Sequence, residues 1–131
     1  MQKLNWPKRQ MDKAQTLHAF FSSFAWKAYD ENTVPDGADL PYLTYEVETD
    51  NIGTTVYLSA SLWSRSTSWA AVEQKAKEIA GSVGYGGVTL PFDGGLLWVT
   101  QGSPFAQRMA DDDDSIRRIM LNFAVEFISA A

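Results

Sequence analysis

The amino-acid sequence predicts an α+β fold, in which a mixed, mostly antiparallel β-sheet carries two helices packed on one face. Three observations lead to this prediction: two segments repeat apolar residues at helical spacing, several others alternate apolar and polar residues, and turn-forming residues separate them. A chain of 131 residues suits one domain with one core. We therefore expect a single domain over 1–131, with residues 1–10 as a loose N-terminal arm and 11–131 as the α+β core.

The first predicted helix covers residues 11–25, MDKAQTLHAFFSSFA. Its apolar stripe consists of Ala14, Leu17, Phe21 and Phe24, and Phe20 widens it. His18, the only histidine, borders this stripe, a position where a structural role is more common than a catalytic one. The following segment, DENTVPDGADLP, is rich in Asp, Asn, Pro and Gly and is expected to form an irregular loop.

Two strands are predicted next, at 42–49 and 54–63, because apolar and polar residues alternate in both. In the first, Leu43, Tyr45 and Val47 share a face; in the second, Val56, Leu58, Ala60 and Leu62 do. The short segment DNIG at 50–53 links them and favours an antiparallel hairpin.

A second helix is expected after Ser68, which is a suitable N-cap. Its apolar stripe comprises Trp69, Val72, Ala76, Ile79 and Val83, whereas Lys75, Lys77 and Glu78 lie off the stripe, towards solvent. The glycine-rich segment GSVGYGG at 81–87 lacks the Lys-Ser/Thr pair of a phosphate loop and follows a helix. Its glycines are therefore expected to end the helix and turn the chain.

A hairpin is predicted at 88–100, where Asp93-Gly94 separates two β-like runs. Pro91 has no N–H to donate to a neighbouring strand, so its strand is expected at an edge of the sheet. The final strand is predicted at 116–128 and is expected to be central, because its alternation is the most regular in the chain. Its core-facing residues are Ile119, Leu121, Phe123, Val125 and Phe127.

Composition excludes several functional classes. The chain has no cysteine, which excludes disulfides, thiol catalysis and cysteine-bound metals and is compatible with the cytosol. A net charge of −5 argues against a sequence-specific DNA-binding protein with a broad basic face. No apolar run approaches the length of a membrane span, and the N-terminus has no apolar signal-peptide region, so no membrane association is expected.

Four aspartates, Asp111–Asp114, precede the final strand and leave three interpretations open: a solvated loop, a weak cation site or a catalytic cluster. The spacing fails as an EF-hand, because Ile116 and Asn122 occupy the positions that need Gly and Glu. Adjacent aspartates in a polar turn stay hydrated and repel one another, which favours the solvated loop. Arg108, Arg117 and Arg118 are expected to offset part of this charge.

No catalytic, cofactor-binding or metal-binding residue is predicted, and the chain is not expected to be an enzyme. It contains no G-x-S-x-G motif, and one histidine cannot supply a zinc site. Trp63, Trp69 and Trp98 could stack on a ligand, but tryptophans in strands and at helix starts more often pack in cores or interfaces.

Several phrases resemble a family of small head–tail joining and tail terminator (tail-completion) proteins of long-tailed bacteriophages and their prophages. They are AYDENTVPDGADLPYLTYEV, ASLWSRSTSW, GGVTLPFDGGLLWVTQGSPFAQRMADDDDSIRRI and NFAVEFISA. The resemblance extends over residues 16–130, and the order of elements is also similar to the tail-terminator fold. It carries no catalytic motif.

The resemblance implies a structural neck or tail protein of the virion, assembled in the host bacterial cytoplasm. Such a protein forms a hexameric ring, although the isolated subunit can be a monomer. The ring caps the tail tube, joins it to the head connector and lets DNA pass without binding it specifically. Two other classes remain open: a phage assembly or adaptor protein that binds partners without forming a ring, and an enzyme or small-ligand binder.

Ring subunits meet through two different surfaces, and sheet edges are natural places for such contacts. We therefore expect the hairpin at 88–100 and the segment 103–109 to take part, with Trp98, Phe105 and Arg108 as candidate interface residues, since aromatics and arginine are enriched in interfaces. The alternative is that Phe105 fills the protein's own core and Arg108 pairs with the aspartates.

Overall fold

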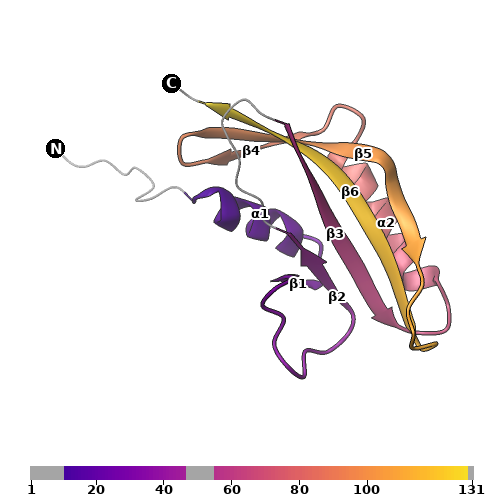
Figure 1. Ribbon diagram of the computed structural model, residues 1–131. Coiled ribbons are helices and arrows are strands. Elements are labelled where there is room, and N and C mark those ends of the chain that lie inside the picture. The colour runs from indigo at the N-terminus through magenta and orange to yellow at the C-terminus, as the bar shows by residue number, and fades with distance from the viewer. Residues whose placement is uncertain (1–10, 47–54, 130–131) are drawn as a thin grey trace.

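The computed structural model describes residues 11–46 and 55–129, which form an α+β fold with two helices and a six-stranded, mixed sheet (Figure 1). The elements are α1 (Lys13–Ser22), β1 (Lys27–Asp30), β2 (Tyr42–Tyr45), β3 (Thr55–Arg65), α2 (Ala70–Val83), β4 (Val88–Phe92), β5 (Gly95–Met109) and β6 (Ile116–Ser129). The predicted arm at 1–10 and the predicted turn at 50–53 lie outside the described residues.

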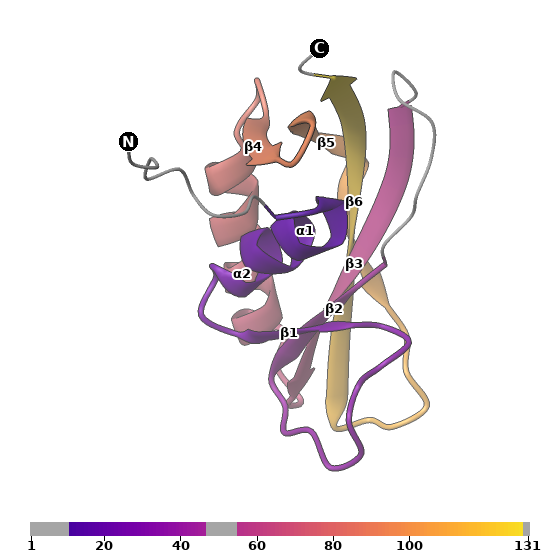
Figure 2. The same cartoon turned by 90° about the vertical axis from the view of Figure 1, so that its left-hand side faces the viewer.

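The strands lie side by side in the order β1-β2-β3-β6-β5-β4. The pairing of β1 with β2 is parallel, and every other pairing in this sheet is antiparallel. Both helices lie on one side of the sheet, as predicted, and the opposite side has no helix over it (Figure 2). Among residues 11–46 and 55–129, no helix is long and apolar enough to cross a membrane.

Helix α1 is shorter than predicted, and its buried face differs at one end. Asp12 is the N-cap, and its side chain and that of Gln15 exchange hydrogen bonds with each other's backbone N–H groups, so the helix begins at a capping box. Leu17 and Phe21 are buried, but Ala14 is exposed and Thr16 is buried instead. The Thr16 hydroxyl can be buried because it donates to the Pro91 carbonyl, 3.3 Å away.

Strand β1 was not predicted from the sequence. It is four residues long, too short to show a reliable alternation of apolar and polar side chains, and it pairs with β2 only in the folded chain. Of the predicted strand at 42–49, residues 42–45 form β2 and residues 47–49 lie outside the described residues. The antiparallel pairing of β2 with β3 confirms the predicted hairpin partners.

Helix α2 departs from prediction at its start and on one face. Trp69, not Ser68, is the N-cap, although the Ser68 hydroxyl accepts a hydrogen bond from the Ala70 N–H. Lys75 was expected in solvent, but its side chain is only 12% exposed. Its ammonium group donates to the Phe24 carbonyl at 2.7 Å and to Glu78 at 2.8 Å, which offsets the loss of hydration.

The glycines after α2 have the expected structural roles. Gly84 is the C-cap, with φ of 68°. A Cβ on Gly87 would lie 2.5 Å from the Val99 carbonyl oxygen, so only glycine allows the chain to pass this close to β5. The Gln101 side chain donates to the Ala80 and Gly84 carbonyls and so satisfies the end of the helix.

The predicted hairpin is present, with Asp93-Gly94 as its turn and β4, which contains Pro91, at the edge of the sheet. Its second strand was predicted to end near residue 100, but β5 continues to Met109. Pairing with β6 is interrupted between Gln101 and Ala106 and then resumes. This irregularity breaks the period-two pattern, which explains why the sequence did not predict one long strand.

Strand β6 is central, as predicted, and pairs along its length with β3 and β5. Ile119, Leu121, Phe123 and Val125 are buried in the core, whereas Phe127 is half-buried against Phe92, with ring centroids 4.8 Å apart. Phe123 is fully buried, and its ring contacts those of Phe21 at 5.5 Å and Phe105 at 5.4 Å. It therefore joins α1 to β5 across the central strand.

We predict that Phe123→Ala lowers the free energy of unfolding by about 3–5 kcal/mol, because the lost aromatic contacts leave a cavity. Urea unfolding followed by circular dichroism measures the change. Tyr85→Ala is the matched control: Tyr85 is exposed, so its loss changes stability by less than about 0.5 kcal/mol. Equal stability of the Phe123 variant and the parent would show that this side chain does not lie in the core.

Candidate functional site

The predicted interface residues do not form one patch. Trp98 lies on the side of the sheet away from the helices, because its neighbours Leu97 and Val99 are the buried ones. Its side chain is held in place, since the indole N–H donates to the Gly86 carbonyl at 2.9 Å, yet Trp98 remains 39% exposed. The Trp98 ring is thus a partly exposed aromatic group whose orientation is fixed by a hydrogen bond.

Phe105 and Arg108 lie on the helix side instead. Phe105 is half-buried, and its ring packs against Phe123 in the core. One interpretation of the sequence paired Arg108 with the aspartates, but the structure pairs it with a different residue. Its guanidinium contacts the Glu73 carboxylate at 2.7 Å and lies 4.6 Å from the Trp69 ring centroid. Both residues therefore have structural contacts within the subunit, and Arg108 joins β5 to α2.

The acidic run Asp111–Asp114 forms an exposed turn between β5 and β6. Its carboxylates organise the turn itself: Asp111 accepts from the Asp113 N–H at 2.9 Å, and Asp113 accepts from the Ser115 N–H at 2.8 Å. The hydrogen bonds that the N–H and the hydroxyl of Ser115 donate to Asp113, and then the charge of Arg65, lower the pKa of Asp113.

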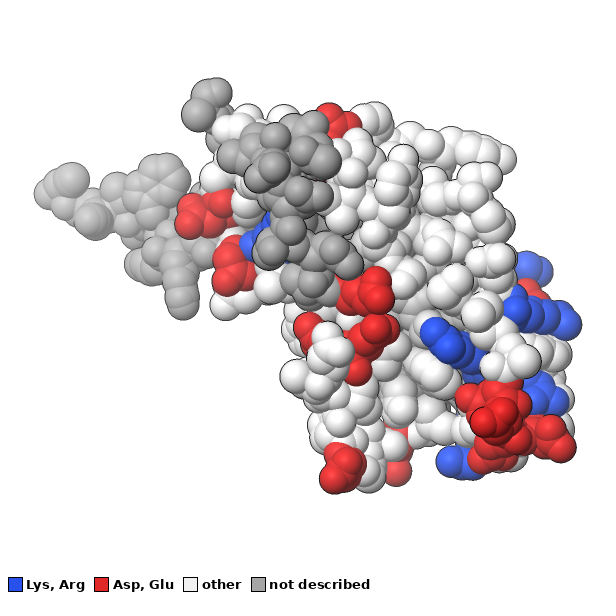
Figure 3. All heavy atoms as spheres, viewed as in Figure 1, with Lys and Arg blue, Asp and Glu red and all other residues white. Residues whose placement is uncertain are grey.

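Basic side chains surround this turn, as Figure 3 shows, but their contacts differ from those predicted. Arg65 forms an ion pair with this turn, with its guanidinium 3.7 Å from the Asp113 carboxylate. Arg117 donates to the Asp114 and Thr67 carbonyl oxygens and so joins the turn to the segment before α2. Arg118 lies over the Trp63 ring, 4.7 Å from its centroid.

Within residues 11–46 and 55–129, no group of three or more histidine or acidic side chains is placed to hold a metal ion. His18 has a structural environment: its Nδ1 is hydrogen-bonded to the Tyr45 hydroxyl at 2.7 Å and its Nε2 to the Ser22 hydroxyl at 3.3 Å. Tyr45 in turn stacks on Phe21, and burial raises the pKa of its phenol. These contacts join α1 to β2.

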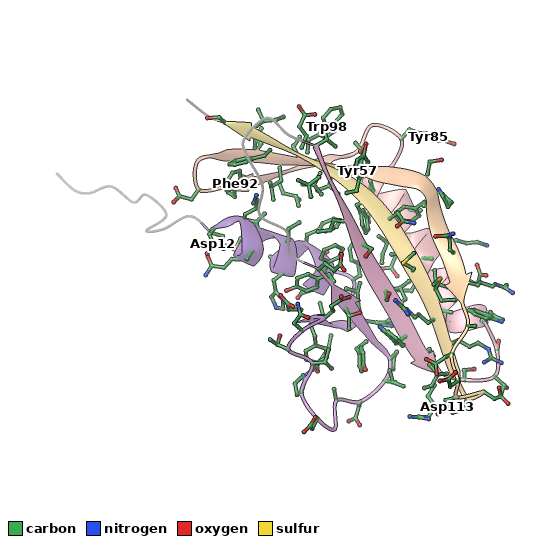
Figure 4. All side chains as sticks on the ribbon, viewed as in Figure 1. Asp12, Tyr57, Tyr85, Phe92, Trp98 and Asp113 are labelled. Atoms are coloured by element: carbon green, nitrogen blue, oxygen red, sulfur yellow. The ribbon has the colours of Figure 1, made fainter. Side chains whose placement is uncertain are left out.

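The uncovered side of the sheet has most of the exposed large apolar side chains of the described chain. Four of the six lie there: Tyr57, Leu96, Trp98 and Ile128. Tyr57 is 76% exposed, and its labelled side chain and that of Trp98 both lie near the upper part of the sheet in Figure 4. Strand alternation predicts which side each residue takes, but only the arrangement of the helices decides which side stays uncovered.

An acidic pair borders this uncovered side. Because β1 and β2 are parallel and pair Asp30 with Tyr45, the next residues, Glu31 and Glu46, come to lie side by side. The Ser59 hydroxyl donates to Glu46 at 3.3 Å. Burial, and then the charge of Glu46, raise the pKa of Glu31, and the charge of Arg118 opposes this rise.

A shallow hollow of about 260 Å³ lies beside Glu46. Its lining includes Tyr57, Ser59, Asn122, Gly102 and Ser103, from β3, β6 and the irregular part of β5. Gly102 passes so close to β6 that a Cβ there would lie 2.9 Å from Asn122 atoms. The irregularity in β5 thus shapes one wall of the hollow.

Comparison with known proteins shows a likeness of fold. No family profile matches the chain, and no curated protein matches its sequence. A chain in the solved structure "Virion of native gene transfer agent (GTA) particle" is similar, with a TM-score of 0.57 and 21% sequence identity. The match covers 86% of this chain and 88% of that chain. The two chains therefore share a fold over nearly their whole lengths.

We predict that Asp113→Asn lowers the melting temperature at neutral pH, whereas Asp112→Asn does not, since only Asp113 accepts hydrogen bonds from Ser115. A carboxyl group with a lowered pKa in the folded state stabilises above its unfolded pKa and loses that effect as the pH falls through the folded value. The difference between the variants should therefore disappear in acid, as thermal melts over a pH series would show.

The same melts test the cation interpretation. If Asp111–Asp114 is a solvated turn, adding Mg²⁺ or Ca²⁺ should not raise the melting temperature of the protein. A saturable rise that Asp112→Asn abolishes would establish a metal site instead.

Proposed function

We propose that this protein is a non-enzymatic structural subunit of a tailed, phage-like particle. More specifically, we propose that it is a tail terminator: a single-domain subunit of a ring, hexameric in the virion, that caps the tail tube and meets the head connector. The observation that carries the proposal is the shared fold, over 86% of this chain, with a chain of a gene transfer agent virion. The finer assignment to a tail terminator follows the resemblance over residues 16–130 that the sequence suggested, and it remains part of the proposal.

The distribution of surface groups supports a role in assembly. Monomeric proteins rarely expose large contiguous apolar surfaces, and such surfaces commonly mark contacts with other proteins. Here Leu96 and Ile128 are directly paired across β5 and β6, and Trp98 pairs with Glu126 in the same pair of strands. The uncovered side of the sheet therefore offers adjacent aromatic and aliphatic groups on a rigid support.

A ring also needs a second, different surface on each subunit. The edge strand β4 is one candidate, because one side of its backbone has no neighbouring strand among the described residues. We propose Trp98 as an interface residue of the uncovered sheet. Phe105 and Arg108, which have structural contacts within the subunit, are proposed as interface residues only through their remaining exposed surface.

The alternative proposal is an assembly or adaptor protein that binds its partners without forming a ring. In that case, the uncovered side of the sheet would bind the partners of the adaptor protein. The two proposals differ in stoichiometry: a ring requires several copies at one end of the tail, which electron microscopy of purified particles can count.

We predict that deletion of the gene leaves filled heads unattached to tails, or tails of irregular length, because the tube end is neither capped nor joined to the head. Negative-stain electron microscopy of the particles measures both defects. Normal particles from the deletion strain would exclude the proposed role.

Complementation of the same strain tests the surface. Trp98→Glu should fold but fail to restore particles, since it places a charge in a contact that excludes water. Tyr85→Glu is the matched control, because Tyr85 is exposed in the loop after α2 and should restore them fully. Melting temperatures of both purified variants show whether each subunit is folded.

A further inference from the structure

We propose that the N-terminal segment of one subunit, residues 1–10, binds the uncovered side of the sheet of the next subunit in the ring. The binding surface is the Trp98 patch, which consists of Tyr57, Leu96, Trp98, Glu126 and Ile128. This inference rests on the proposed function and names the partner of that surface, which is a second copy of this chain.

The segment is opposite in charge to the rest of the chain. It holds no acidic residue and three basic ones, Lys3, Lys8 and Arg9. Residues 11–131 hold the other eight basic residues against all sixteen acidic residues. A segment of this composition is attracted to the acidic body of a neighbouring subunit, and it has apolar side chains to bury there, those of Leu4 and Trp6.

The Trp98 patch offers matching groups. Cross-strand pairs place Glu126 between Trp98 on β5 and Thr55 on β3, and residues paired in this way point to the same side of the sheet. Within residues 11–46 and 55–129, none of the ion pairs includes Glu126. The patch thus presents one carboxylate among aromatic and aliphatic side chains, which suits a segment that carries both basic and apolar residues.

The length of the segment also fits the patch. From the level of Leu96 to that of Tyr57 the patch extends about 13 Å along the strands, and from β5 to β3 it extends about 10 Å across them. Ten residues of chain span at most about 33–36 Å. The segment is therefore long enough to leave its own subunit and to cross the patch of the next one.

The segment joins the fold on the side of the subunit opposite to the patch. The carbonyl of Met11 accepts a hydrogen bond from the Asp93 N–H at 2.7 Å, which holds the start of the described chain beside the β4–β5 turn. Helix α1 begins two residues later, on the helix side of the sheet, and Figure 4 shows Asp12 and Phe92 at the same end of the molecule. A head-to-tail contact can bring this helix side to the uncovered side of the next subunit, whereas the segment would have to turn back around the sheet to reach its own patch.

Two patches are a poor match for each other. A symmetric contact between them would bring two Glu126 carboxylates together in a surface from which water is excluded, where like charges repel strongly. Such a contact would also close a pair of subunits instead of a ring, because it uses the same surface on both. The segment of a second copy has neither disadvantage, and each subunit of a ring supplies one segment and one patch.

Disulfide trapping in assembled particles tests the contact, and it is specific because the chain has no cysteine. Asn5→Cys places a thiol in the segment, and Thr55→Cys places one beside Glu126. Particles from the complemented deletion strain are oxidised and run on a non-reducing gel. They should show a ladder of linked subunits, because each disulfide joins one copy to the next.

The matched control combines Asn5→Cys with Thr33→Cys. Thr33 is exposed in the loop between β1 and β2, so this pair should give no ladder. A disulfide within a single chain, or no disulfide between positions 5 and 55, would overturn the inference while leaving the proposed function intact. Normal particles from the deletion strain would exclude the proposed function itself.

Peptide binding tests the same contact without particles. A fluorescein-labelled peptide of residues 1–10 should bind saturably to the purified chain at a concentration at which the chain is monomeric, as fluorescence anisotropy would show. Trp98→Ala and Glu126→Lys should each weaken this binding about tenfold or more, because they remove the aromatic and the acidic partner of the segment. Tyr85→Ala is the control, since Tyr85 lies outside the patch, and it should bind like the parent. Absence of saturable binding, or parental binding by the folded Glu126→Lys variant, would overturn the proposal.

Discussion

The position of β6 between β3 and β5 is the constraint on which the rest of the structure depends. An internal strand has both edges occupied by hydrogen bonds, so its only free surfaces are its two faces. One face of β6 is uniformly apolar, from Ile119 to Val125, and must be covered by other apolar groups. Helices α1 and α2 provide that cover, and Phe123 is the residue at which α1, β5 and β6 meet.

Covering one face of the sheet leaves the other face without a helical layer among the described residues. The helices of the described residues both pack on the same side (Figure 2). The uncovered face therefore combines polar residues, which remain hydrated, with a few large exposed aromatic and aliphatic groups. This combination leaves apolar area in contact with water, and removing that area from water would be favourable.

Charge is arranged differently around the two acidic groups. At the turn of Asp111–Asp114, backbone N–H groups and Arg65 satisfy the carboxylates locally, and arginines stack on Trp63 and Trp69 nearby. At Glu31 and Glu46, two carboxyl groups lie near each other; the Ser59 hydroxyl donates to Glu46, and the charge of Arg118 acts on Glu31.

The sequence by itself determined the elements whose signals are local. Period-two alternation located β3 and β6, the apolar stripe located α2, and Asp93-Gly94 located the hairpin, because backbone geometry and side-chain periodicity act over a few neighbouring residues. The α+β class and the edge position of Pro91 followed from the same local rules. Such rules also suggested that the aspartates form a solvated turn.

Only the tertiary structure decided what depends on distant residues. The parallel pairing of β1 with β2 places Glu31 beside Glu46, although they are far apart in the chain. The contact of Arg108 with Glu73 and the burial of Lys75 against Phe24 likewise require α2 to pack on its neighbours. Side-chain pairing of this kind is set by the three-dimensional packing of whole elements, which no local pattern of residues encodes.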